Sequence, residues 1–190
     1  MNENMQNNIE EILKNNPLIP VVTVHDLNEL DAIYTKLKAK DISCIEITLR
    51  TPESWEAIAV FKEKYGAEFN VGAGTIVSVS DIEKCMELKL DFMVSPGLTS
   101  KLSQHLIYSE IAFLPGISTP SEIIRGMEMG FAYFKFFPAQ QFGGINALKT
   151  YAGLFKTVSF CPTGGINASN YRDFLALKNV ISVGGSWLVQ

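Results

Sequence analysis

Residues 131–138 read Phe-Ala-Tyr-Phe-Lys-Phe-Phe-Pro and follow Gly130. A short run this rich in aromatic residues, with a glycine before it and a proline at its end, predicts a buried β-strand. Its one charged residue is Lys135, and lysine is seldom fully buried unless its charge is compensated. Burial disfavours the charged ammonium, and a neutral amine is the nucleophile that Schiff-base chemistry requires. The alternative is an edge-strand lysine that extends its amine to water.

Strand-like and helix-like segments alternate along the rest of the chain with a period of roughly twenty residues. A helix start is indicated at Thr51-Pro52-Glu53, with Thr51 as the N-cap, and another at Ser118-Thr119-Pro120. The expected strands are 19–24, 43–49, 69–75, 91–95, 111–114, 131–138, 158–161 and 180–183.

Eight such units without a long linker predict an α/β protein, a (β/α)8 barrel of the TIM type. We expect a single domain over residues 1–190, with a polar N-terminal segment over 1–16. Only residues 184–190 follow the last strand, so most of the closing C-terminal helix of such a barrel is expected to be absent. A doubly wound open sheet is the alternative, although residues 72–77 lack the third glycine of a dinucleotide-binding motif.

Composition and charge exclude several classes of protein. The chain is 47% hydrophobic and 19% charged, with a net charge of −4 and a pI near 5.2, so no basic surface suggests nucleic acid or an anionic membrane. The first eight residues do not resemble a signal peptide, and no apolar run approaches the roughly 18 residues of a membrane span. Three widely spaced cysteines favour free thiols in a reducing cytoplasm, and two isolated histidines predict no metal site.

The strand over residues 44–50, Cys-Ile-Glu-Ile-Thr-Leu-Arg, alternates polar and apolar residues. Period-2 geometry places Ile45 and its apolar neighbours on the face toward the helices, and Glu46, Thr48 and Arg50 on the face toward the interior. Burying a carboxylate and a guanidinium is costly unless they are paired or hydrogen-bonded. The pattern fits either a structural Glu–Arg pair or a carboxylate base beside an anion-binding arginine.

Glycine clusters follow several strands, and those after the last two are Thr163-Gly164-Gly165 and Gly184-Gly185-Ser186. Backbone N–H groups at this position commonly hold a phosphate in barrels of this type. Ordinary turns explain the same glycines equally well.

Seven motifs occur in order along the chain and together resemble the bacterial 2-keto-3-deoxy-6-phosphogluconate (KDPG) aldolase and 4-hydroxy-2-oxoglutarate (KHG) aldolase family. The resemblance runs from about Ile19 to the C-terminus. The motifs are residues 46–51 (EITLRT), 71–75 (VGAGT), 95–99 (SPGLT), 114–120 (LPGISTP), 134–139 (FKFFPA), 161–166 (CPTGGI) and 184–188 (GGSWL).

The resemblance implies a (β/α)8 barrel, usually a homotrimer, that works as a class I aldolase with no metal and no other cofactor. It implies that Lys135 forms the Schiff base, that Glu46 is the general acid/base, and that Arg50 and Thr75 hold the pyruvyl carboxylate. The residues that it implies for the rest of the site are Pro96 and Phe137 for pocket shape, Thr163 for stereochemistry, and Gly164, Gly165, Gly184 and Ser186 for phosphate.

The expected reaction is the reversible cleavage of KDPG to pyruvate and glyceraldehyde 3-phosphate in the cytoplasm, a step of the Entner–Doudoroff pathway. The expected partners are these small molecules and further copies of the chain, with neither nucleic acid nor membrane. Three alternatives remain: cleavage of KHG to pyruvate and glyoxylate, an isomerase or decarboxylase reaction without an imine, and a non-catalytic phosphate-binding barrel.

Overall fold

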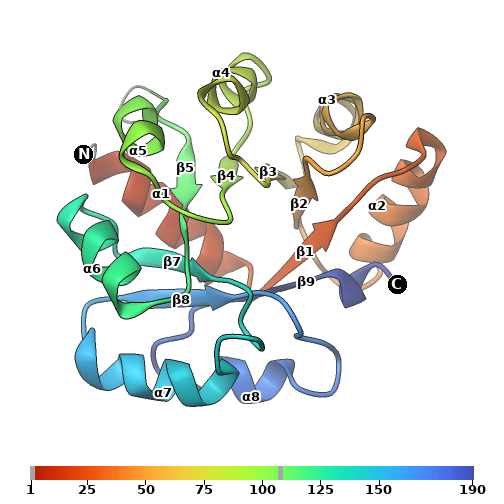
Figure 1. Ribbon diagram of the computed structural model, residues 1–190. Coiled ribbons are helices and arrows are strands. Elements are labelled where there is room, and N and C mark those ends of the chain that lie inside the picture. Colours follow the sequence, from red (N-terminus) through yellow and green to blue (C-terminus); the bar gives the residue numbers. More distant parts are fainter. Residues whose placement is uncertain (1–2, 107–108) are drawn as a thin grey trace.

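The computed structural model describes residues 3–106 and 109–190, in which strands and helices alternate along the chain (Figure 1). The strands are β1 (Leu18–Val22), β2 (Cys44–Thr48), β3 (Asn70–Gly74), β4 (Phe92–Val94), β5 (Ala112–Leu114), β6 (Gly116–Ile117), β7 (Tyr133–Phe136), β8 (Ser159–Pro162) and β9 (Val183–Gly185). The helices are α1 (Glu3–Asn15), α2 (Leu30–Lys38), α3 (Ser54–Tyr65), α4 (Val79–Glu87), α5 (Ser100–Leu106), α6 (Pro120–Glu128), α7 (Gly144–Leu154) and α8 (Tyr171–Leu175), with 3₁₀ turns η1 (Leu27–Glu29) and η2 (Ser186–Leu188).

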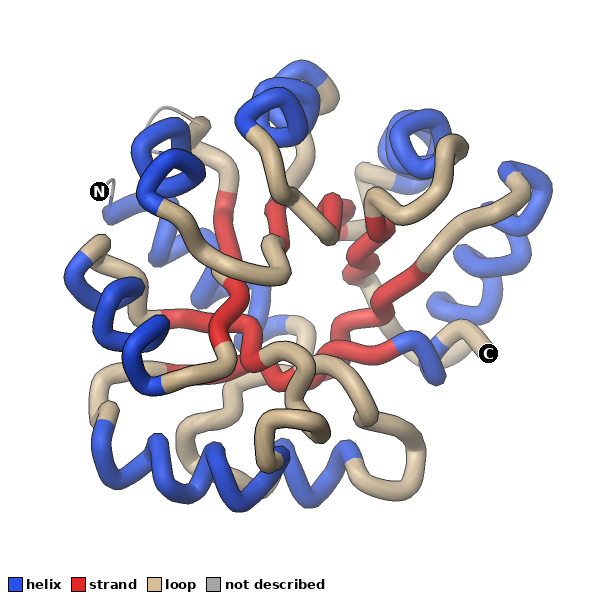
Figure 2. The backbone as a smooth tube through the Cα atoms, in the orientation of Figure 1, coloured by secondary structure: helices blue, strands red, loops and turns tan. Residues whose placement is uncertain are grey.

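The strands form two parallel sheets that curl around a common interior, with most helices outside them (Figure 2). One sheet has the order β5-β4-β3-β2-β1-β9, and the other has the order β6-β7-β8. Pro115 separates β5 from β6, and isolated bridges from Phe160 to Val180 and from Thr163 to Gly184 join β8 to the segment of β9. The protein therefore has an α/β fold built on a curled parallel sheet.

The outward face of the sheet is apolar and packs against the helices. In β2, Ile45 and Ile47 are fully buried in one cluster with Ala57, Ile58 and Phe61 of α3. This arrangement confirms the alternation predicted for residues 44–50, because the residues between them face the interior of the sheet.

Helix α1 closes one end of the interior. Its buried residues Ile9 and Leu13 belong to a second apolar cluster with Ile19, Cys44 and Phe92, which lie near the beginnings of their strands. We predict only a polar segment over residues 1–16 from the sequence, although the spacing of Ile9, Ile12 and Leu13 is the pattern of an amphipathic helix. The end of the sheet at which the strands begin is therefore filled by side chains, and the opposite end is left for a site.

Helix α6 begins as predicted, with Thr119 as N-cap and Pro120 as the first helical residue. The predicted N-cap at Thr51 is wrong, because α3 begins at Ser54. The Thr51 hydroxyl donates to the Val24 carbonyl at 2.6 Å, and its N–H donates to Ser54 Oγ at 3.1 Å. Thr51 thus connects its loop to the segment that follows β1 instead of capping a helix.

The predicted eighth strand, 180–183, begins three residues and ends two residues too early, because β9 is Val183–Gly185. Val180 makes only an isolated bridge to Phe160, whereas the continuous pairing with β1 begins at Val183 and runs to Gly185. The Val183 N–H donates to the Pro17 carbonyl at 2.9 Å, so the register of β9 is set by β1 and not by its own apolar run.

In the described part of the chain, no helix is both long enough and apolar enough to cross a membrane.

Replacing Leu13 by alanine tests the packing of α1. Leu13 is 2% exposed, and deleting a buried leucine side chain costs about 2–5 kcal/mol of unfolding free energy. Urea denaturation measures the loss, and Glu11→Ala on the exposed side of the same helix controls for the change in helix propensity. Equal stability of Leu13→Ala and Glu11→Ala would show that α1 does not contribute to the core.

Candidate active site

A buried ion pair crosses the interior of the curled sheet. Lys135 of β7 donates to the carboxylate of Glu46 of β2, with its Nζ 3.0 Å from Oε1 and 3.4 Å from Oε2. The side chains of Lys135 and Glu46 are only 5% and 3% exposed. A pair removed from water in this way must be compensated internally, and each group here is the other's partner.

Gly74 makes room for the Glu46 carboxylate. A Cβ atom built on Gly74 would overlap Glu46 Oε1 and would lie 2.7 Å from both Cγ and Cδ of that side chain. Gly74 is the last residue of β3, and it pairs with Thr48 of β2. The absence of a side chain at this position therefore allows the carboxylate to lie where Lys135 can reach it.

Two thiols lie in the interior near this pair but differ from the amine in chemistry. Cys161 of β8 pairs with Lys135 in the strand register. Burial raises the pKa of the Cys161 thiol to about 12, and burial also raises the pKa of Cys44 well above its usual range. Because a thiol must lose its proton to act as a nucleophile, both cysteines stay inert beside Lys135 at neutral pH.

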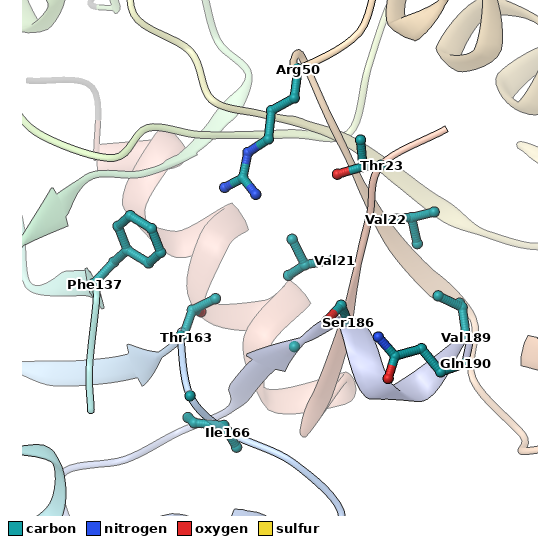
Figure 3. A pocket seen from close by; sticks show the side chains of 13 residues that line it. Val21, Val22, Thr23, Arg50, Phe137, Thr163, Ile166, Ser186, Val189 and Gln190 are labelled. Carbon is teal, nitrogen blue, oxygen red and sulfur yellow. The ribbon is translucent and has the colours of Figure 1, made fainter. Parts of the chain in front are cut away.

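A cavity of about 370 Å³ opens at the strand ends opposite α1 (Figure 3). Arg50, which is exposed, extends its guanidinium into this space, and the ring of Phe137 faces the same space. Phe137 also borders the ion pair, because Lys135 Nζ lies 5.3 Å from its ring centroid. The cavity is lined by Val21, Val22, Thr23, Arg50, Phe137, Thr163, Gly164, Gly165, Ile166, Gly185, Ser186, Val189 and Gln190.

Two glycine-rich loops form the side of the cavity that follows β8 and β9. Gly164 and Gly165 have φ angles of 98° and 76°, a region that favours glycine, so the chain can turn sharply there. Ser186 is exposed to the cavity at the start of η2. Gly184 does not line the cavity. It packs so closely against Thr163 that a Cβ there would overlap Thr163 Oγ1, and Gly185 lines the cavity in its place.

The remaining predicted site residues, Thr75 and Pro96, follow β3 and β4 and do not line this cavity. Thr75 has a φ angle of 68°, which is a strained conformation for a β-branched residue and is typical of functional sites. Pro96 is exposed, and its backbone packs so closely on Gly116 that a Cβ there would overlap it.

Within the residues that the structure describes, no group of three or more histidine, cysteine or acidic side chains is arranged to bind a metal ion.

Comparison with known proteins adds an assignment to this geometry. The family model described as KDPG and KHG aldolase matches residues 9–190. The chain belongs to this family. The KHG/KDPG aldolase of Escherichia coli is 44% identical over 188 residues, which cover 98% of this chain and 87% of the relative.

Two solved structures of aldolases are similar in fold. The KDPG aldolase of Legionella pneumophila, with pyruvate captured as a covalent carbinolamine intermediate, has a TM-score of 0.90 at 39% identity and covers 94% of this chain and 86% of that one. The KDPG aldolase of Zymomonas mobilis with 3-phosphoglycerate has a TM-score of 0.91 at 37% identity and covers 96% and 86%.

For a member of the KDPG and KHG aldolase family, the structure brings some residues to the cavity that sequence reasoning missed. Val22 and Thr23 lie at the end of β1, and Gly185 lies between two residues that were singled out. Of these three residues, Thr23 could have been found from the sequence, because it is a polar residue within the apolar run over residues 19–24.

Replacing Gly74 by alanine is expected to displace the Glu46 carboxylate. The kcat for aldol cleavage of KDPG should then fall by on the order of 10²-fold or more, which is the usual contribution of a positioned acid/base group. The matched control is Gly153→Ala in α7, where no atom lies within 4 Å of the added Cβ. Steady-state assays measure both variants, with circular dichroism to verify folding. A wild-type kcat in Gly74→Ala would mean that the carboxylate position is not critical.

Proposed function

We propose that this protein is a class I aldolase that reversibly cleaves KDPG to pyruvate and glyceraldehyde 3-phosphate, with Lys135 as the Schiff-base residue. The observation that carries this proposal is the amine of Lys135, buried 3.0 Å from the Glu46 carboxylate and close to a cavity that an arginine enters. The relative solved with a pyruvate carbinolamine supports the same chemistry.

The ion pair supplies the proton transfer that the reaction needs first. When the proton on Lys135 moves to Glu46, both groups become neutral, and neither leaves an unpaired charge in the interior. The free amine attacks the C2 ketone of the substrate to give a carbinolamine. Glu46 returns the proton to the hydroxyl group of the carbinolamine, which leaves as water, and the resulting protonated imine withdraws electrons from C3.

Glu46 as a carboxylate then removes the proton of the C4 hydroxyl, directly or through one water. The C3–C4 bond breaks, its electron pair moves toward the imine to form an enamine, and the aldehyde leaves. Protonation of the enamine at C3 and addition of water to the imine release pyruvate and restore Lys135.

The other predicted residues bind and orient the substrate in this proposal. Arg50 grips the pyruvyl carboxylate, for which a guanidinium offers a bidentate donor pair, and the strained Thr75 lies at the neighbouring strand end to assist. Residues that shape the pocket or set stereochemistry are Pro96, Phe137 and Thr163.

The phosphate is assigned to the loops after β8 and β9. Gly164 and Gly165 offer backbone N–H groups beside the cavity, and Ser186 offers a hydroxyl. Gly184 contributes by letting Thr163 pack closely rather than by facing the ligand. The relative solved with 3-phosphoglycerate supports a phosphorylated ligand.

Cleavage of KHG is a second candidate activity of the same site, because a relative at 44% identity is named for both substrates. KHG shares the 2-keto acid and the C4 hydroxyl on which Lys135 and Glu46 would act. It lacks the phosphate, so the two activities differ in their dependence on the glycine-rich loops.

Further proposals concern architecture and setting. We propose one domain over residues 1–190, with 1–16 as its N-terminal segment, in which β5 and β6 act as one interrupted strand of a (β/α)8 barrel. Hydrogen bonds on both sides of Pro115 support this: Ser95 N donates to Leu114 O at 3.2 Å, and Lys135 N donates to Pro115 O at 2.9 Å.

A cytoplasmic homotrimer is proposed as well, and exposed apolar side chains such as Phe142 and Leu154 suit contacts between copies.

Trapping with borohydride and pyruvate tests the imine. A secondary amine should form on Lys135, located by intact-mass and peptide analysis, and Lys62→Met, which removes a lysine outside the site, should leave it unchanged. An adduct on another lysine would show that Lys135 is not the Schiff-base residue. The absence of any adduct would overturn the imine mechanism and favour an isomerase, a decarboxylase or a non-catalytic barrel. Glu46→Gln is the companion variant: it should still form the adduct and lose cleavage by roughly 10²–10⁴-fold, since an amide cannot accept the C4 proton.

Replacing Ser186 by alanine tests the phosphate site. A hydrogen bond to a charged group contributes about 1.5–3 kcal/mol, so kcat/KM for KDPG should fall by roughly 10–100-fold. The value for KHG should change little, because that substrate carries no phosphate. An equal loss of kcat/KM for KDPG and KHG would mean that these loops are turns and do not bind the phosphate.

A further inference from the structure

Thr23 places a hydroxyl on the wall of the cavity, immediately after the end of β1. Its side chain is half-buried, and its oxygen points toward the space that the guanidinium of Arg50 enters (Figure 3). Thr23 Oγ1 lies 2.8 Å from the hydroxyl of Thr48, a fully buried residue of β2. None of the roles described above uses this hydroxyl.

The neighbours of Thr23 fix the direction of its hydrogen bond. Thr48 Oγ1 lies 3.2 Å from the Val22 carbonyl oxygen, which can only accept, so the single proton of the Thr48 hydroxyl is committed there. With the Thr48 proton on that carbonyl, Thr48 accepts and Thr23 donates in the pair of threonines, where the 2.8 Å distance alone fits either direction. The oxygen of Thr23 keeps its acceptor lone pairs for the cavity, where it meets a ligand as an acceptor.

The position of β1 in the sheet indicates which part of a substrate meets this acceptor. β1 lies between β2, which carries Glu46, and β9, which leads to Ser186. The register is close, with Val21 opposite Glu46 on one side and Pro20 opposite Gly185 on the other. A substrate that extends from Glu46 at C4 to Ser186 at its phosphate must cross the end of β1, where Thr23 lies.

We infer that Thr23 is a specificity-determining residue that accepts a hydrogen bond from the C5 hydroxyl of the substrate, which is the 2-hydroxyl of the aldehyde product. This inference rests on the proposed function. Arg50 and the backbone N–H groups of the cavity are donors, so they cannot take the proton of this hydroxyl. Thr23 thus selects aldehydes hydroxylated next to the carbonyl carbon.

The experiment removes the hydroxyl from the protein and from the substrate in turn. Aldol addition of pyruvate is measured with glyceraldehyde 3-phosphate and with 3-phosphooxypropanal, which lacks the 2-hydroxyl, in wild type, Thr23→Val and Thr23→Ser. The ratio of kcat/KM for the two aldehydes should fall by roughly 3- to 10-fold in Thr23→Val, the range for one neutral hydrogen bond. Thr23→Ser, which keeps the hydroxyl, should retain the wild-type ratio.

An unchanged ratio in Thr23→Val would overturn the inference and reduce the threonine pair to a packing role. Borohydride trapping of pyruvate by each variant verifies that the site still folds. If Thr23→Val does not fold, Thr23→Ala is measured with the same two aldehydes in its place. Failure of the proposed function looks different: wild type would then add pyruvate to neither aldehyde.

Discussion

The ion pair between Lys135 and Glu46 is the constraint on which the rest of the structure depends. Removing two charges from water costs several kcal/mol per ion, and only a close, well-aligned contact recovers that free energy. The contact at 3.0 Å joins β7 to β2, which are not neighbours in either sheet. The sheet must therefore curl until these two strands face each other. The same contact between Lys135 and Glu46 thus constrains the curvature of the sheet and the geometry of the candidate site.

Along the strand direction, the interior is divided into an apolar layer and a region with buried polar side chains. Near the beginnings of the strands, Cys44 and Phe92 pack with Leu13 of α1 in an apolar layer. Farther along β2 the inward residues become Glu46 and Thr48, both buried. The apolar layer keeps water from reaching the ion pair from the side of α1, so in the proposed function a substrate reaches Lys135 from the cavity at the other end. Burial also raises the pKa values of the thiols of Cys44 and Cys161, so they stay protonated, and in the proposed mechanism the amine of Lys135 is the nucleophile.

How far the sequence predicts this arrangement depends on whether a feature is local. Alternation along β2 correctly placed Glu46 on the inward face, and the aromatic run around Lys135 correctly indicated a buried strand. Thr119 caps its helix as its own sequence predicts. Thr51 carries an equally good local signal and fails, because its hydroxyl donates to the carbonyl of Val24 in the loop after β1. The register of β9 and the docking of α1 are likewise set by residues distant in sequence, which no local pattern contains.

The glycines show the same limit within the site. All of them read as turn signals in the sequence, yet Gly74 leaves space for a carboxylate, Gly165 adopts a positive φ, and Gly184 allows a threonine to pack closely. Only the surroundings distinguish these uses. The direction of the hydrogen bond at Thr23 is a comparable case, because it depends on a proton that Thr48 gives to a third residue. Donors for anionic groups and an acceptor for a hydroxyl thus border one cavity, and a phosphorylated hydroxy acid needs both kinds of partner. That match arises from the way neighbouring strands bring distant residues together.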